Sequence, residues 1–331
     1  MSYVVGTGSF LPNRNVSNSD LAEMLNDDAE SIFGKTGIRN RRWADSGTTT
    51  TELAAEAVLS ALADAGLKTT DLDYLIVGTM TPDRFIPGDG GIVQSRLGLN
   101  AIPCLDIRNA CCNGLYGLQL GSALIGTEKV EHLAICCSEI QSRYLNLQPV
   151  ASNISMLFGD AASCIILAPK PTKGALRVLD VIIHSDGQYA DALGVRSPGV
   201  AFENPGAEDY LPRMDGRTVI THALRSLEQI ILELLSRNAL SNNDVEWVVP
   251  HQANANLFRE LARRLDYPLD RIVSVIEETG NTSSASMGLA LDHLRRTNTL
   301  SEGALIVLPA FAAGFSWGAA LLQAVHPGEG R

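Results

Sequence analysis

Apolar residues along the chain alternate between short continuous runs and longer stretches with helical spacing. The runs at residues 3–8 and 73–78 are short and apolar, which indicates buried strands. The stretch Thr50–Ala65 carries apolar residues three and four positions apart and is followed by Gly66, so it predicts a helix that ends at this glycine. Strands that alternate with helices are typical of an α/β fold.

The rest of the first half continues this alternation. Residues 132–138 and 162–167 are predicted as further strands, separated by a loop-rich segment at 141–159. The polar residues 18–20 are expected to cap the helix that follows them. Residues 37–43 are basic, and their apolar residues follow neither the helical spacing of three to four residues nor the alternation of a strand, so they are expected to form a loop.

The second half repeats the first in order and character. The strand-like run at 71–78 has a counterpart at 244–250, and each leads into a polar loop. A polar turn at 279–291 opens a helix of small residues. We therefore predict a duplicated βα arrangement, with one half at residues 1–172 and the other at 173–331. Equivalent loops of two such halves would face each other across a pseudo-twofold axis, so Cys111, His251 and Asn281 are expected to converge although they lie far apart in the sequence.

The most informative stretch, residues 103–118, begins as an apolar run of strand character and changes to helical spacing at Cys111. Unpaired N–H groups and the helix dipole at such a junction stabilise a thiolate and can hold an oxyanion. A cysteine placed there is a candidate nucleophile. Taken alone, Cys111 and Cys112 are also readily explained as small residues of a buried core.

Composition narrows the class of protein. The chain has 331 residues, of which 45% are hydrophobic and 5% aromatic, with 29 glycines, and this favours helices packed closely on a sheet. The net charge of −11 and the isoelectric point near 5.0 argue against nucleic acid as a partner. No apolar run reaches the ~18 residues that span a bilayer, and the amino terminus has no signal-peptide pattern, so a cytoplasmic protein without a membrane anchor is expected.

Cysteine spacing and local charge add little to this. The six cysteines include two adjacent pairs and no Cys-x-x-Cys spacing, so neither a metal site nor a disulfide framework is predicted. Arg259, Arg263 and Arg264 share one side of a predicted helix after His251, where an acidic partner could dock. A solvated helix face explains the same charges equally well.

Five motifs occur in the order found in one known family. They are Asp106-Ile107-Arg108-Asn109-Ala110-Cys111, Phe158-Gly159-Asp160, His251-Gln252-Ala253-Asn254, Gly280-Asn281-Thr282-Ser283 and Phe311-Ala312-Ala313-Gly314-Phe315-Ser316-Trp317-Gly318. Together they resemble the β-ketoacyl-acyl-carrier-protein synthase III family of the thiolase superfamily, over essentially the whole chain. The resemblance implies a thiolase-like, duplicated five-layered αβαβα fold and a homodimer.

The resemblance also implies an activity, acyl transfer to a cysteine followed by decarboxylative Claisen condensation with a malonyl thioester. Cys111 would be the nucleophile, because counting along the first motif without a gap reaches it rather than Cys112. The backbone N–H groups of Cys111 and Ala313 would hold the oxyanion, and His251 and Asn281 would stabilise the enolate oxygen. No cofactor would be needed, since the substrates are thioesters of coenzyme A or acyl carrier protein.

Some positions bear on the choice of substrate. Ser31 stands where coenzyme A users of the family often have tryptophan. Ile86 replaces a phenylalanine that closes the acyl pocket of the partner subunit, so acyl groups longer than acetyl are expected, in a pocket to which Phe311 also contributes. Arg263 and Arg264 match basic positions that dock acyl carrier protein. Fatty acid synthesis and a polyketide or other secondary route both stay open.

Other functions are compatible with the same fold. A thiolase would need a second catalytic cysteine in the C-terminal half, but no cysteine follows Cys164, and an elongating synthase would need histidine in place of Asn281. The main alternative is an acyltransferase that moves the acyl group to an oxygen or nitrogen nucleophile in secondary metabolism, although a carboxylate at position 281 would serve it better as a base. A non-catalytic binding protein would have no use for the nucleophile, the histidine and the asparagine together.

Overall fold

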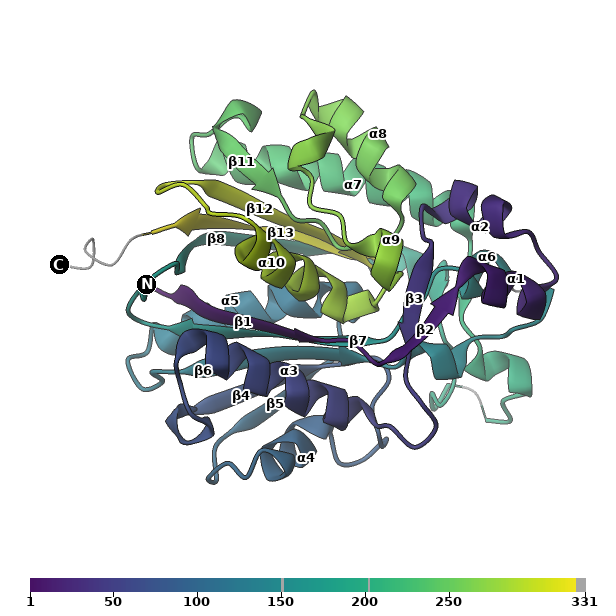
Figure 1. Cartoon of the computed structure of the whole chain (residues 1–331), viewed down its shortest axis with the longest axis horizontal. Helices are drawn as coiled ribbons and strands as arrows, with labels where there is room; N and C mark the ends of the chain where they lie inside the picture. The colour runs from purple at the N-terminus through teal and green to yellow at the C-terminus, as the bar shows by residue number, and fades with distance from the viewer. Residues whose placement is uncertain (150–151, 202, 326–331) are drawn as a thin grey trace.

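The computed structural model describes residues 1–149, 152–201 and 203–325, and nine of its strands form one sheet (Figure 1). The strands of the first half are β1 Tyr3–Phe10, β4 Tyr74–Gly78, β5 Cys104–Ile107, β6 Leu133–Glu139 and β7 Ala161–Ala168. Those of the second half are β8 Leu176–Ser185, β11 Val245–Val248, β12 Leu305–Ala312 and β13 Ser316–Ala324. The strands predicted near residues 3, 73, 132, 162 and 244 are confirmed.

Both halves of the sheet have the same strand order and the same pairing directions. In the first half, β4 pairs in parallel with β5 and β6, and β7 pairs antiparallel with β6 and β1. In the second half, β11 pairs in parallel with β12 and with a bridge at Ile272, and β13 pairs antiparallel with β12 and β8. This repeat confirms the predicted duplication. The division predicted after residue 172 falls between β7 and β8 and stays a prediction, because β1 and β8 pair across it in one continuous sheet.

Helices lie outside and between the two halves of the sheet (Figure 1). On the outer faces, α3 Thr50–Ala65 and α4 Asp89–Arg96 cover the first half, and α7 Gly216–Arg237 and α8 Ala255–Leu265 cover the second. The middle layer consists of α5 Asn113–Ile125 and α10 Ser286–Thr297. This is the expected αβαβα arrangement. No helix in the described part of the chain is long and apolar enough to cross a membrane.

The middle layer is narrow because its helices carry small residues where they face the strands. A Cβ added at Gly117 of α5 would lie 2.4 Å from Cγ2 of Ile135 on β6. A Cβ added at Gly288 of α10 would lie 2.4 Å from Oγ of Ser163 on β7. Larger residues would therefore push both helices away from the sheet. Because the turns that carry Cys111 and Asn281 lead into these two helices, the close packing also fixes the position of both turns.

A small unit beside the sheet corrects two of the predictions. It contains β2 Arg14–Ser17, α1 Asn18–Leu25, α2 Ala29–Thr36 and β3 Asn40–Trp43. Residues 37–43 are therefore not all loop: β3 pairs antiparallel with β2 and buries Arg41, which donates hydrogen bonds to Oδ1 of Asn18 and to the backbone oxygen of Met156. A buried arginine reads as polar in the sequence and hides the alternation of the strand.

The second correction concerns the cap of α1. The expected cap at residues 18–20 lies one position too late, because the side chain of Ser17 caps the helix and accepts a hydrogen bond from the N–H of Asp20. Three further short elements supply residues that line the cavities described below: α6 Ser152–Ser155, β9 Leu193–Gly194 and β10 Arg213–Met214. Another short helix, α9 Ile276–Thr279, precedes the turn that carries Asn281.

Candidate active site

Cys111 lies at the junction of a strand and a helix, as the sequence predicts. β5 ends at Ile107, and a 3₁₀ turn at Ala110–Cys112 leads directly into α5. Ala110 has a φ of 47°, a left-handed conformation that is uncommon for a residue with a side chain and that recurs at functional sites. Cys111 lines two cavities, whereas Cys112 is fully buried and its thiol is hydrogen bonded to the backbone oxygen of Ser316.

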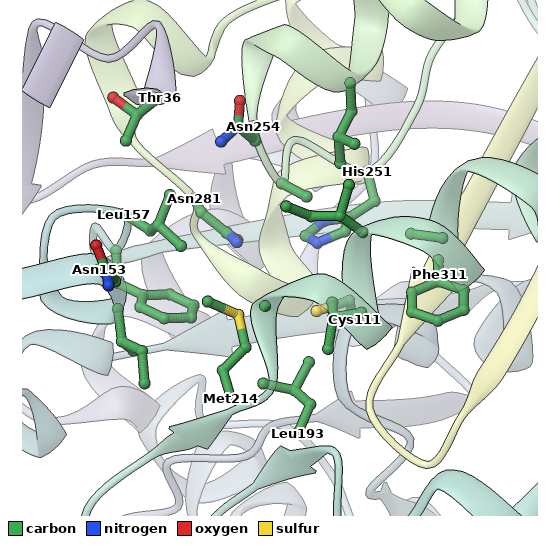
Figure 2. Close-up of a pocket in the computed structure, with 18 of the residues that line it drawn as sticks. Thr36, Cys111, Asn153, Leu157, Leu193, Met214, His251, Asn254, Asn281 and Phe311 are labelled. Carbon is green, nitrogen blue, oxygen red and sulfur yellow. The ribbon is translucent and has the colours of Figure 1, made fainter. Parts of the chain in front are cut away.

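The first of these cavities brings together residues from both halves of the chain. Its volume is about 460 Å³, and Cys111, His251 and Asn281 line it together with Phe311. Figure 2 shows the amide nitrogen of Asn281 and a ring nitrogen of His251 pointing into the cavity that the Cys111 sulfur also faces. The loop after β11 supplies the histidine and the turn before α10 supplies the asparagine. The convergence expected from the duplicated halves therefore takes place in one cavity.

His251 is held as a neutral imidazole of defined orientation. Burial lowers the pKa of this ring to about 4, so the ring carries no charge at neutral pH. Its Nδ1 lies 2.6 Å from Oγ of Ser286, and that oxygen also accepts the N–H of Gln252 at 3.1 Å. Among the described residues, Nδ1 is the acceptor available to the Ser286 hydroxyl hydrogen, which leaves the ring hydrogen on Nε2. His251 therefore presents an N–H donor to the cavity.

Asn281 is oriented by its neighbours in the same way. The N–H of Ser283 donates to Oδ1 of Asn281 at 2.8 Å, which leaves the side-chain NH₂ group to face the cavity. The backbone of Asn281 pairs with the start of the Phe158-Gly159-Asp160 motif. Its N–H donates to the backbone oxygen of Leu157, directly before the motif, at 2.8 Å, and its oxygen accepts the N–H of Gly159 at 3.0 Å. A Cβ at Gly159 would lie 2.2 Å from the backbone oxygen of Thr279, so only glycine allows this approach. This motif therefore positions the carboxamide.

The protonation state of Cys111 differs from the expectation based on its place at a helix start. Burial is the main cause that raises the pKa of this thiol to about 12. The hydrogen bond to Ser283 lowers the pKa in part, and the charge of Glu139 raises it further. The removal of water therefore outweighs the helix terminus in the resting site. The sulfur keeps its proton until a base accepts it, so acyl transfer to Cys111 requires a proton acceptor in the site.

A second cavity, of about 600 Å³, meets the first one at Cys111. Ala313 and Ser283 line this second cavity, as does Phe85 of the loop before α4. Of the two residues predicted for the acyl pocket, Phe311 lines the first cavity rather than the second. Ile86 lines neither cavity of its own chain and is 78% exposed, and its contact with the acyl pocket of a partner subunit stays a prediction.

The two arginines predicted to dock a carrier protein lie at the end of α8, and both form ion pairs with glutamates of the same chain. Arg263 is paired with Glu260 at 2.7 Å, and Arg264 is paired with Glu260 at 3.0 Å and with Glu228 at 2.9 Å. These contacts lie on the protein surface, where ion pairs contribute little and exchange readily. An acidic partner would have to compete with both glutamates for the guanidinium groups.

Three residues at the site have no role in the sequence-based prediction. Ser283 and Ser286 lie in and beside the fourth motif, and their hydroxyls contact Cys111 and His251 respectively. Glu139 lies directly after the run predicted as a strand at 132–138 and is fully buried. An acidic residue that closes a buried apolar run is unusual and is the signal that could have identified it.

A cysteine at a helix start, a neutral imidazole donor and a carboxamide donor in one cavity define an acyl-transferring condensing enzyme on a thiolase-like fold. Comparison with known proteins specifies the family. Residues 105–187 match the family model for 3-oxoacyl-[acyl-carrier-protein] synthase III, and residues 235–324 match the model for its C-terminal part. The chain belongs to the 3-oxoacyl-[acyl-carrier-protein] synthase III family.

Individual relatives match this chain over nearly the whole length of both sequences. The β-ketoacyl-[acyl-carrier-protein] synthase III of Alkalilimnicola ehrlichii is 37% identical over 327 residues, 98% of this chain and 100% of the relative. The crystal structure of the enzyme from Pseudomonas aeruginosa PAO1 is 32% identical, with a TM-score of 0.89 over 98% of this chain and 99% of that one. The priming β-ketosynthase of the R1128 polyketide pathway is 30% identical, with a TM-score of 0.90 over 99% and 97%.

The activity of this family is that of a condensing acyltransferase, and the chain is an enzyme of that kind. The function implied by the sequence resemblance is confirmed, and so is its fold. The family uses thioesters of coenzyme A and acyl carrier protein as substrates and needs no cofactor. Among the described residues, no cluster of three or more histidine, cysteine or acidic side chains could hold a metal ion.

Proposed function

We propose that Cys111 carries the acyl group and that His251 and Asn281 activate the malonyl thioester. The observation that supports these roles is the hydrogen bonding behind the two donors. Ser286 occupies Nδ1 of His251 and the N–H of Ser283 occupies Oδ1 of Asn281, so the remaining polar atoms of both side chains are donors that face the cavity. Two preorganised donors of this kind favour an oxygen on which negative charge develops.

The proposed reaction has two halves. In the first, the Cys111 sulfur attacks an acyl thioester, the backbone N–H groups of Cys111 and Ala313 hold the oxyanion, and the carrier thiolate leaves. In the second, a malonyl thioester loses carbon dioxide while His251 Nε2–H and the Asn281 amide donate to the enolate oxygen. The resulting carbanion attacks the acyl carbonyl, and the Cys111 thiolate leaves. Decarboxylation supplies the carbanion, so no base is required to form it.

We also propose a homodimer in which the loop before α4 closes the acyl cavity of the partner. Two large apolar side chains of this loop, Phe85 and Ile86, are 68% and 78% exposed in the single chain. Adjacent exposed apolar side chains favour a contact that removes them from water. The six free thiols support the proposal that the enzyme works in the reducing cytoplasm.

Intact-protein mass spectrometry with a series of acyl-coenzyme A thioesters tests this function and the acyl preference together. The second cavity, at about 600 Å³, is of the size that holds whole ligands, so acyl groups longer than acetyl are expected to load faster than acetyl. Each additional buried methylene contributes ~0.8 kcal/mol, which corresponds to a rise of up to about fourfold in the rate constant for loading. Malonyl carrier protein added afterwards should discharge the label and release a β-ketoacyl product.

The matched variant for the acyl series is Ile86→Phe. If Ile86 borders the partner's cavity, the larger ring shortens the preferred chain and leaves acetyl loading unchanged. A wild-type enzyme that loads only acetyl would contradict the longer-chain preference. Discharge of the label only by an alcohol or amine would contradict condensation and favour simple acyl transfer.

We further propose that Arg263 and Arg264 dock the acyl carrier protein despite their ion pairs. Reversing both charges to glutamate should raise KM for malonyl carrier protein about tenfold, since each of the two exposed charge pairs lost contributes up to about 1 kcal/mol, and should leave acyl-coenzyme A loading unchanged. The control reverses two exposed lysines, Lys170 and Lys173, in the connection between β7 and β8. It makes the same change in net charge, so an equal rise in KM would show that only long-range charge matters.

A further inference from the structure

A buried carboxyl group that the condensation steps do not use lies close to Cys111. Glu139 is the last residue of β6 and is 0% exposed. Five hydrogen-bond donors surround its two oxygens: the N–H of Met80, the hydroxyl of Thr81, the side-chain amide of Gln141, and the hydroxyls of Ser283 and Ser284. None of the ion pairs between described residues contains Glu139. The described residues therefore surround this carboxyl with hydrogen-bond donors.

One of these donors also contacts the proposed nucleophile. Oγ of Ser283 lies 3.8 Å from Sγ of Cys111 and 3.3 Å from Oε1 of Glu139. The φ of 50° at Ser283 is left-handed, and its N–H is held by Asn281 at 2.8 Å. We propose that Ser283 and Glu139 form a proton relay that accepts the thiol proton of Cys111 when the enzyme is acylated. The proposal rests on the assigned role of Cys111 as the acylated residue.

His251 is a poor candidate for the same task. Its Nδ1 is engaged by Ser286, and its Nε2 carries the hydrogen that the enolate needs. Burial lowers the pKa of His251 to about 4, which makes the ring a weak base. The two half-reactions therefore use different residues. Glu139 accepts the thiol proton during acylation, and His251 donates a hydrogen bond to the enolate oxygen during decarboxylation.

The relay also avoids an additional buried charge. The S–H bond of Cys111 breaks as its proton passes to Oγ of Ser283, and the Ser283 hydroxyl hydrogen passes to Oε1 of Glu139. The sulfur forms its bond to the thioester carbonyl carbon, and the carrier thiolate leaves and takes a proton from solvent. When condensation later expels the Cys111 thiolate, Glu139 returns the stored proton through Ser283. The negative charge moves within the site, so its desolvation cost does not increase.

The environment of Glu139 suits a group that exchanges protons near neutral pH. Burial raises the pKa of the Glu139 carboxyl to about 7, and hydrogen bonds, the one from Ser284 first among them, limit the rise. The titratable groups that face it are the thiols of Cys111 and Cys137 and the phenol of Tyr144. All three are uncharged at pH 7 because burial raises their pKa values. Glu139 is therefore a carboxylate above about pH 7 and an acid below it.

Single-turnover acylation of Cys111, followed by intact mass against pH, tests the relay. In the wild type, the rate constant should rise through about pH 7 as Glu139 ionises. Glu139→Gln removes the base and keeps the shape, so acylation at pH 8 should slow about 100-fold and the inflection should disappear. Glu139→Asp should restore part of the rate and the inflection, which a merely structural role would not explain.

Two neighbouring serines provide matched variants. Both hydroxyls donate to Oε1 of Glu139, but only Ser283 contacts Cys111, so Ser283→Ala should slow acylation far more than Ser284→Ala. Thermal unfolding of each variant excludes misfolding as the cause. Wild-type rates and an unchanged pH profile in Glu139→Gln, or equal losses in the two serine variants, would overturn the relay. A wild-type enzyme that never carries the acyl group on Cys111 would instead overturn the proposed function.

Discussion

Cys111→Ala should abolish acyl loading, with no acyl adduct seen by intact mass after incubation with acyl-coenzyme A. The reason is chemical: alanine offers no nucleophile, and the binding cavities alone cannot form a covalent intermediate. Cys111 is also the only one of the adjacent cysteine pair that lines the cavities. Overall condensation should fall by at least about 10⁴-fold, the order of effect seen when a catalytic nucleophile is removed.

Cys112→Ala is the matched control because it removes the same thiol one residue away. Cys112 is fully buried and bonded to the backbone oxygen of Ser316, so the substitution should cost about 1 kcal/mol of stability and leave acyl loading largely intact. Loading that survives in Cys111→Ala and is lost in Cys112→Ala would move the nucleophile to the second cysteine. Peptide mapping of the labelled wild type gives the same assignment independently.

Asn281→Ala and His251→Ala should each reduce decarboxylative condensation about 10²- to 10³-fold and leave acyl loading close to normal. In the proposed mechanism each variant removes one donor to the enolate oxygen, and one such donor in a preorganised site contributes roughly 3–4 kcal/mol to the transition state. Release of carbon dioxide from labelled malonyl thioester, measured on enzyme that already carries the acyl group, separates this step from loading. Equal losses in both half-reactions would contradict the assigned division of roles.

The residue next to Asn281 supplies the control. The Thr282 hydroxyl is buried and has no hydrogen-bond partner among the described residues, so Thr282→Val removes a polar atom of the same turn without breaking a bond. Condensation by this variant should stay near the wild-type rate. A loss as large as that of Asn281→Ala would mean that the turn tolerates no change and that the carboxamide has no special role.

The pH dependence of the two half-reactions should differ, because different titratable groups serve them. The pKa of His251 is lowered to about 4, so its neutral donor form predominates at every pH above about 5, and the decarboxylation rate should show no inflection from this ring near neutrality. Acylation should instead follow the carboxyl of Glu139 near pH 7.

Local patterns in the sequence carried much of the fold. The helix Thr50–Ala65 was predicted with both ends correct because its apolar spacing and a capping glycine agree, and Gly66 has the expected left-handed φ of 69°. The prediction that residues 37–43 form a loop was wrong because the burial of Arg41 depends on partners from other segments, Asn18 and Met156. A side chain whose burial is decided by tertiary contacts gives no periodic signal.

By itself, the sequence determined the chemical types at the site and the order of the elements that carry them. Cys111 could be named from its place where a strand-like run changes to helical spacing, whereas His251 and Asn281 could be named only because their motifs resemble those of the synthase III family. The tertiary structure decided which side chains meet and which hold protons. Glu139 and Cys111 are brought together through Ser283, 144 residues from the first and 172 from the second, and burial by both halves sets their pKa values. Desolvation depends on everything packed around a group, and no short stretch of sequence contains that information.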